Sequence, residues 1–244
     1  MVVLSQRVRL AVIAAALAAA AVAFPAVAAE KVQLARVQSE DAVFRVVQVA
    51  GGLSHPWSLA FLPGGGMLVT EREGRLLLLE SGTLTPVAGL PEIRAGGQGG
   101  LLDLALHPRF AENRLLYFTY SAGRGAELGT RVARGRLTGT RLTDVEVLYV
   151  MRPGSAGALH FGARLAFAAD GTLLVSLGER NERNRAQDLR DPGGSVLRLT
   201  DDGRVPADNP FVGRADALPE IWTWGHRNPQ GLTVQPGTGL AWMV

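Results

Sequence analysis

LAFLPGGGMLVT, residues 59–70, is a pair of short apolar runs joined by a Pro-Gly turn. Glycine and proline between two apolar runs predict a β-hairpin, because they supply the backbone angles that a tight reversal needs. The same arrangement returns three times, as LALHPRFAENRLLYF (104–118), LAFAADGTLLVS (165–176) and LTVQPGTGLAW (232–242). These units begin at Leu59, Leu104, Leu165 and Leu232, so their spacings are 45, 61 and 67 residues. The sequence therefore predicts a repeated β unit.

Further strand candidates lie between the paired runs, at residues 75–80, 130–137, 145–150 and 195–200. Each unit would then hold about four strands, as a β-propeller blade does. Propeller blades recur every 40–50 residues or so, and longer spacings are expected where loops are inserted. Jelly rolls and sandwiches also use short strands, but the repeat favours an all-β propeller, here incomplete, of about four blades. The longest polar insertion, residues 178–194, is predicted to be a loop on the binding face.

The first 28 residues are predicted to be a signal peptide. Arg7 and Arg9 precede an apolar run at residues 10–24, and small residues follow at 26–29, the pattern that a signal peptidase cleaves. An uncleaved membrane anchor is the alternative, but the apolar run is shorter than the roughly 20 residues that a span requires. We therefore expect a periplasmic or secreted protein with no membrane span after cleavage. Residues 29–45 are interpreted as a lead-in and residues 46–244 as the propeller domain.

Charge and cysteine content exclude several classes of protein. The formal charge is +3, and it falls to +1 once Arg7 and Arg9 are removed with the signal peptide. The remaining basic residues are scattered arginines, whereas a nucleic-acid-binding protein presents a clustered basic face. The chain contains no cysteine, which excludes disulfides, thiolate metal sites and cysteine nucleophiles.

The chain ends inside the fourth unit, where Val244 closes an apolar run. Four units do not close a ring unless the last is completed from elsewhere. We therefore expect the sequence to be a fragment that is truncated at its C-terminus and inactive by itself.

Three polar clusters lie beside the repeated strands. Gln98 is flanked by glycines that let the backbone bend tightly and present its amide. His160 precedes a strand, where an imidazole can act as a general base. Arg227 and Asn228 follow two tryptophans and supply a guanidinium fork and an amide. Each cluster alone is also compatible with an ordinary turn or a packed histidine. No nucleophile elbow, zinc-protease motif or dinucleotide fingerprint is present.

Taken in order, these clusters resemble the soluble pyrroloquinoline-quinone (PQQ) aldose dehydrogenase and glucose/sorbosone dehydrogenase family. The resemblance rests on six segments that span nearly the whole predicted mature chain: residues 55–61, 97–107, 160–181, 186–189, 208–211 and 225–232. Family members are six-bladed propellers. The resemblance implies oxidation of the anomeric hydroxyl of an aldose to a lactone, with electrons passing to PQQ and then to a soluble electron acceptor.

The resemblance also implies roles for individual residues. His160 would be the general base, Gln98 would line the same pocket, and Arg227 and Asn228 would hold the quinone oxygens. PQQ and Ca²⁺ are the implied cofactors, with the calcium-ligand segment expected beyond Val244, so no metal ligand is assigned in this chain. Leu159 departs from the family pattern, because relatives carry an acid or an amide before the histidine.

Two alternatives remain open at the level of sequence. One is a non-catalytic propeller that binds sugar or protein at its loop face. The other is a calcium-dependent propeller of the lactonase type, which hydrolyses sugar lactones without a quinone. Uptake of PQQ separates the dehydrogenase from both.

Overall fold

The computed structural model describes residues 31–244, so the predicted signal peptide lies outside the described residues. Three antiparallel sheets of four strands and two of two strands account for the described fold. The first four-stranded sheet, blade 1, contains β3 (Pro56–Phe61), β4 (Met67–Glu71), β5 (Arg75–Glu80) and β6 (Thr83–Val87). Blade 2 contains β7 (Leu101–Leu106), β8 (Leu115–Ala122), β9 (Gly129–Thr138) and β10 (Arg141–Val150). Blade 3 contains β11 (Gly162–Phe167), β12 (Leu173–Leu177), β13 (Val196–Leu199) and β14 (Ile221–Thr223).

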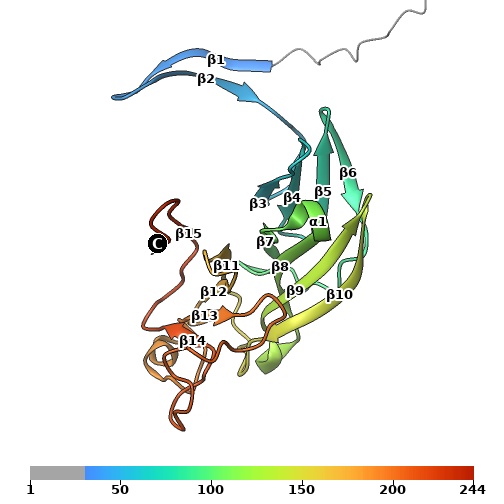
Figure 1. Cartoon of the computed structure of the whole chain (residues 1–244). Coiled ribbons are helices and arrows are strands. Elements are labelled where there is room, and N and C mark those ends of the chain that lie inside the picture. Colours follow the sequence, from blue (N-terminus) through green and yellow to red (C-terminus); the bar gives the residue numbers. More distant parts are fainter. Residues whose placement is uncertain (1–30) are drawn as a thin grey trace, which may run out of the picture.

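A fourth, two-stranded sheet follows blade 3 and consists of β15 (Leu232–Val234) and β16 (Ala241–Met243). The blades fan around a common centre, with β3, β7, β11 and β15 innermost and β6, β10 and β14 outermost (Figure 1). Helix is confined within residues 31–244 to short turns such as α1 (Phe110–Asn113). The all-β prediction is confirmed, and the arrangement is that of a partial β-propeller: three four-stranded blades and the two inner strands of a fourth.

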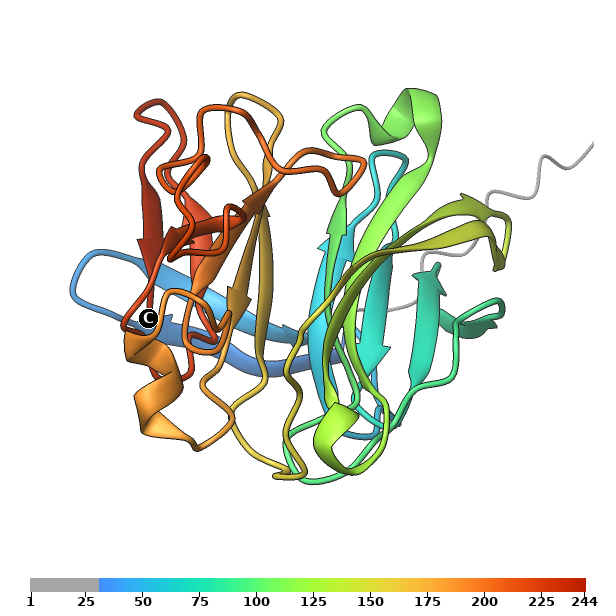
Figure 2. The ribbon, with the colours of Figure 1, turned by 90° about the horizontal axis from the view of Figure 1, so that it is seen from below.

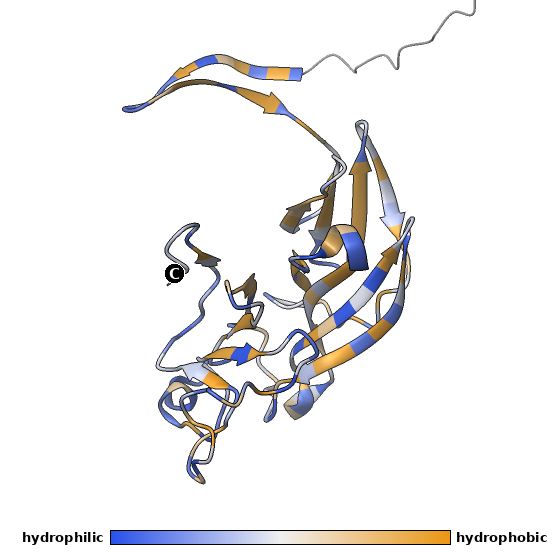
Figure 3. Ribbon diagram, in the orientation of Figure 1, coloured by the Kyte–Doolittle hydropathy of each residue, from blue (hydrophilic) through white to orange (hydrophobic). Residues whose placement is uncertain are grey.

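The hydrophobic core lies between successive blades. One cluster joins Leu68 and Leu78 of blade 1 to Leu104 and Phe118 of blade 2. A second cluster joins the opposite face of blade 2 to blade 3, where Val175 and its neighbours are buried. Hydrophobic residues accordingly run along the strands of the blades (Figure 3). Both faces of blade 2 are covered near the centre, and its two inner strands, β7 and β8, are accordingly apolar almost throughout, whereas β9 and β10 also carry charged residues.

One hydroxyl in the second strand of each blade ties that blade to the next. Thr119 of β8, for example, accepts a hydrogen bond from the backbone N–H of Asp103 at 2.9 Å and donates to the carbonyl of Ala163 at 2.7 Å. Thr70 of β4 joins β3 to β7 in the same way. Ser176 of β12 joins β11 to the segment just before β15. We call Thr70, Thr119 and Ser176 the interblade hydroxyls. Each satisfies two buried backbone groups at a break in strand register, so it fixes how one blade sits against its neighbour.

A charged contact crosses the same inner strands. The carboxylate of Asp103 in β7 is buried and accepts hydrogen bonds from the Ser58 hydroxyl at 2.5 Å, the Arg164 guanidinium at 3.0 Å and the Leu165 N–H at 2.7 Å. Its partners lie in β3 and β11, so this one side chain joins three blades. Burial raises the pKa of Asp103, and the Arg164 charge opposes that rise.

A hairpin of β1 (Lys31–Gln38) and β2 (Val43–Gln48) stands apart from the blades (Figure 1). It spans the segment that was interpreted as a lead-in and extends past residue 45, the predicted start of the propeller domain. Apolar side chains such as Leu34 and Phe44 are exposed on it. The domain boundaries of 29–45 and 46–244 stay predictions.

Candidate functional site

The predicted site residues come from different blades and gather on one face of the array. Gln98 precedes β7, His160 precedes β11, and Arg227 with Asn228 precedes β15. The loops of the blades collect at two opposite faces (Figure 2), and these residues all belong to the face from which the inner strands begin. The structure therefore brings together residues that are distant in the sequence: Gln98 and His160, for example, are 62 residues apart.

Gln98 holds the backbone of His160. Its side-chain oxygen accepts the His160 backbone N–H at 2.8 Å, and the backbone N–H of Gln98 donates to the Ala158 carbonyl at 2.8 Å. The preceding Gly97 has a φ of +56°, and a Cβ there would lie 2.5 Å from the Ala158 oxygen, so a side chain would prevent this approach. Gln98 thus lies beside His160 as predicted, but its amide oxygen is used to position the histidine.

A glutamate that the sequence analysis did not single out lies at the centre of the group. The Nδ1 atom of His160 is 2.8 Å from Oε2 of Glu179, which lies two residues after the end of β12 and is 1% exposed. Glu179 also donates its N–H to the Arg227 carbonyl at 2.9 Å, and its Oε2 accepts the N–H of Asn181. A carboxylate on Nδ1 favours the tautomer with its proton on that nitrogen, which leaves Nε2 as the basic atom.

Nε2 of His160 has no hydrogen-bond partner among residues 31–244. The His160 backbone has a φ of +53°, an uncommon conformation for a residue with a side chain. Such conformations persist only where the surroundings fix them, and they cluster at functional sites. Here Gln98 and Glu179 fix both the backbone and the ring.

Arg227 and Asn228 complete the group. The Asn228 side-chain oxygen accepts the Gly162 N–H at 3.0 Å. The amide N–H₂ of Asn228 has no protein acceptor within the described chain. The Arg227 side chain is 66% exposed, and its Nε lies 3.8 Å from Oε1 of Glu179. Gly178 makes this packing possible, because a Cβ at that position would overlap the His160 carbonyl. The site therefore offers one base and two unused donors side by side.

Arg180 supports the loop that carries His160. Its guanidinium is buried, stacks 3.5 Å from the centre of the Phe161 ring and donates to the carbonyls of Leu159, Ser155 and Gly157. Burial, together with the nearby Arg185 charge, lowers the pKa of Arg180 to about 10, so it stays protonated at neutral pH. The cation thus holds residues 155–159 in place beneath the site.

Replacing Arg180 with glutamine is expected to lower the free energy of unfolding by about 2 kcal/mol, because buried carbonyls lose a charged donor. Chemical denaturation of the purified chain measures this change. Arg183→Gln is the matched control, since Arg183 is exposed in the same insertion and should shift stability by less than about 0.5 kcal/mol. Equal effects of the two substitutions would contradict the role given to Arg180.

His107 and the two tryptophans that precede Arg227 have structural contacts of their own. His107 is packed against Tyr117 and accepts the Arg109 N–H at 2.9 Å, so its role is structural. Trp222 lies under the Arg198 guanidinium, and Trp224 packs on Phe211. These aromatic contacts give neither tryptophan a role at His160.

No group of three or more His, Cys, Asp or Glu side chains within residues 31–244 could hold a metal ion, so no described residue is assigned to calcium. Within the same residues, no helix is long and apolar enough to cross a bilayer.

Residues 53–244 match the family model described as Glucose / Sorbosone dehydrogenase. The aldose sugar dehydrogenase YliI of Escherichia coli is 43% identical over 197 residues, which cover 78% of this chain and 53% of the relative. Quinoprotein glucose dehydrogenase B of Acinetobacter calcoaceticus is 32% identical over 242 residues, covering 85% of this chain and 49% of the relative.

Among solved structures, the PQQ-bound aldose sugar dehydrogenase of Streptomyces coelicolor superimposes with a TM-score of 0.70 at 32% identity. The match covers 80% of this chain and 57% of that one. The chain thus spans about half the length of the curated relatives it matches.

Proposed function

Since this chain belongs to the glucose/sorbosone dehydrogenase family, we propose that the whole protein oxidises the anomeric hydroxyl of aldose sugars to lactones, with PQQ as the electron acceptor. The observation that carries the proposal is the pairing of His160 with the buried Glu179, which leaves Nε2 free beside two unused donors. The names of the relatives support the same substrate class and cofactor. The proposal includes a periplasmic or secreted location and a soluble electron acceptor.

His160 would take the proton. Its Nε2 accepts the proton of the anomeric hydroxyl while the C1–H bond breaks and the C=O bond of the lactone forms. The Glu179 carboxylate stabilises the resulting imidazolium through Nδ1–H, and Gln98 holds the backbone of His160 in place. PQQ, when bound, supplies the two-electron acceptor for the hydride.

The donors at the site fit an oxygen-rich, anionic ring. The exposed Arg227 guanidinium and the Asn228 amide N–H₂ both lie next to His160 and have hydrogen-bonding capacity to spare. They would hold the quinone oxygens and stabilise negative charge that develops there, which is where fixed donors contribute most to catalysis. Calcium enters the proposal only through the family, and no step is derived from it.

The test is reconstitution of the complete gene product with PQQ and Ca²⁺. We expect stoichiometric quinone uptake, seen as a change in its visible absorption, and aldose-dependent reduction of a dye. Removal of Ca²⁺ with a chelator should abolish dye reduction. Sugar or protein binding without quinone uptake would favour the non-catalytic propeller, and lactone hydrolysis without quinone would favour the lactonase type. Either result would overturn the dehydrogenase proposal.

A further inference from the structure

We propose that a hollow in blade 2 binds the acidic group of a small sugar acid or sugar phosphate. The hollow has a volume of about 210 Å³ and is lined by Glu92, Arg94, Ala122, Gly123, Arg124 and Arg131. We call it the arginine hollow. It shares no residue with the His160 site, so its ligand can be tested without PQQ.

The charge of the lining favours an anion. Three arginines and a single acid, Glu92, line the hollow, which leaves an excess of positive charge. Within residues 31–244, none of these three arginines forms an ion pair. Elsewhere in the chain arginines are commonly paired, as Arg214 is with Asp216 at 2.8 Å. The hollow therefore holds positive charge that the described protein does not neutralise.

Two of the arginines are fixed at the backbone. Arg94 donates its N–H to the Ser121 carbonyl at 2.8 Å, and its carbonyl accepts the Ser121 hydroxyl at 2.6 Å. Arg131 lies in β9, opposite the buried Tyr120 of β8. The Nε atom of Arg131 is buried and has no hydrogen-bond partner in the described chain. Arg131 therefore keeps hydrogen-bonding capacity and positive charge that the described protein does not use up.

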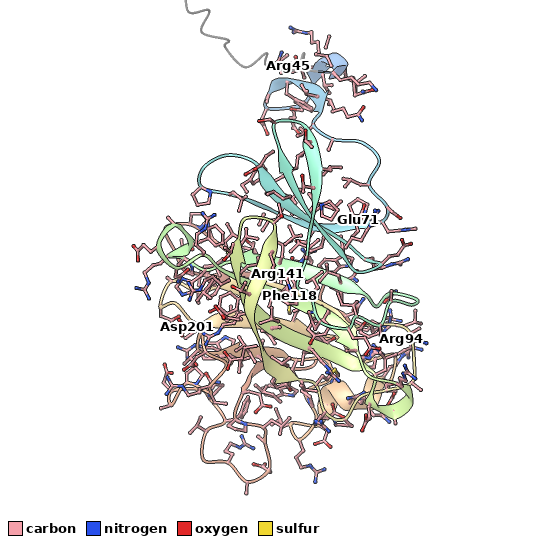
Figure 4. The ribbon with its side chains drawn as sticks, turned by 90° about the vertical axis from the view of Figure 1, so that its right-hand side faces the viewer. Arg45, Glu71, Arg94, Phe118, Arg141 and Asp201 are labelled. Atoms are coloured by element: carbon pink, nitrogen blue, oxygen red, sulfur yellow. The ribbon has the colours of Figure 1, made fainter. Side chains whose placement is uncertain are left out.

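The hollow opens on the same face as the candidate site. Arg94 lies four residues before Gln98, and Thr130, next to Arg131, donates its hydroxyl to the Phe161 carbonyl at 2.9 Å. Figure 4 shows Arg94 and Asp201 at opposite sides of the molecule, with Phe118 between them. An anion in the hollow would therefore lie on the face that carries His160, against residues that the candidate site does not use.

The lining also limits the class of ligand. Arginine forks match the paired oxygens of carboxylate and phosphate. The volume is smaller than the roughly 300 Å³ at which pockets for drug-sized molecules begin, so the ligand is small. Glu92 can accept hydrogen bonds from hydroxyl groups, and acidic sugars carry such hydroxyls beside their charge.

The experiment is calorimetric titration of the full chain, without PQQ, with gluconate, glucose 6-phosphate and glucose. We expect at least one acid to bind and neutral glucose to bind at least about tenfold more weakly, and the preferred acid identifies the source of the charge. Arg131→Gln and Arg94→Gln should each weaken binding of that acid at least about tenfold. Arg214→Gln is the control and should leave binding unchanged.

Circular dichroism of each variant separates loss of the site from loss of the fold. Binding of the acid should also weaken as salt rises, because the attraction is electrostatic and partly exposed. Equal binding of glucose and both acids, absence of binding by either acid, or unchanged binding in a folded Arg131→Gln variant would each overturn the proposal. Failure of PQQ uptake would leave it intact, so the two proposals fail separately.

Discussion

Replacing His160 with alanine is expected to lower kcat for aldose oxidation by about 10²- to 10⁴-fold, the usual contribution of a positioned general base. The reason is that Nε2 of His160 is the basic atom left free beside Arg227 and Asn228. The affinity for PQQ should change little, because the two donors remain. Steady-state kinetics and titration of quinone absorption, both on the complete gene product, measure the two quantities.

His55→Ala is the matched control for this variant. His55 also lies at the start of an inner strand on the same face, with a φ of +47°, but its side chain is 60% exposed and its Nδ1 pairs with Glu73 at 3.2 Å. Its removal should leave kcat within about twofold of the parent, since surface changes of this kind cost little. A His160→Ala variant that turns over sugar as fast as His55→Ala does would remove the base from the mechanism.

Replacing Asp103 with alanine is expected to lower the free energy of unfolding by about 3 kcal/mol or more. The change leaves three donors without their acceptor: the Ser58 hydroxyl, the Arg164 guanidinium and the Leu165 N–H. Breaking a buried charged pair from one side typically costs about 3–5 kcal/mol, and Arg164 is partly exposed, which places the expectation at the lower end. Chemical denaturation with a two-state fit measures the loss.

Asp103→Asn should cost less than Asp103→Ala. An amide keeps an acceptor oxygen in place, and burial already disfavours the charge, as the raised pKa of Asp103 indicates. Asp216→Ala is the control, since Asp216 forms only an exposed pair with Arg214. Asparagine proving as damaging as alanine would show that the charge itself, and not the acceptor, holds the three strands together.

Much of the fold could be predicted because each repeat is marked locally, by turn residues between two apolar runs. Four turns, each between two apolar runs, gave eight strands in the right pairs. The weaker strands were missed for physical reasons. β6 contains Pro86, which lowers strand propensity but is tolerated in an outermost strand, and β14 has only three residues inside a run that also carries site residues. The β1–β2 hairpin was missed because it packs on no blade, so no turn signal or repeat spacing marks it.

The site was predictable only in part. Gln98, His160, Arg227 and Asn228 stood out as polar clusters beside the strands, but their roles came from the family resemblance; the structure brings all four together. Glu179 was missed because nothing local distinguishes it from the other acids of the polar insertion at residues 178–194. Its position two residues after β12 was the available signal, since the end of that strand pairs with the start of β11. Which acid reaches the imidazole is decided by the pairing of distant loops, and spacing along the chain does not encode it.

The interblade hydroxyls make the alignment of the site a cumulative property of the scaffold. Gln98 belongs to blade 2, His160 to blade 3 and Asn228 to the entry of the next sheet, and Thr119 and Ser176 are the joints between those parts. A shift between two blades displaces every blade that follows, so small errors in blade position add up along the chain. A substitution at Thr119 is therefore expected to lower catalytic activity, although that hydroxyl does not contact the base.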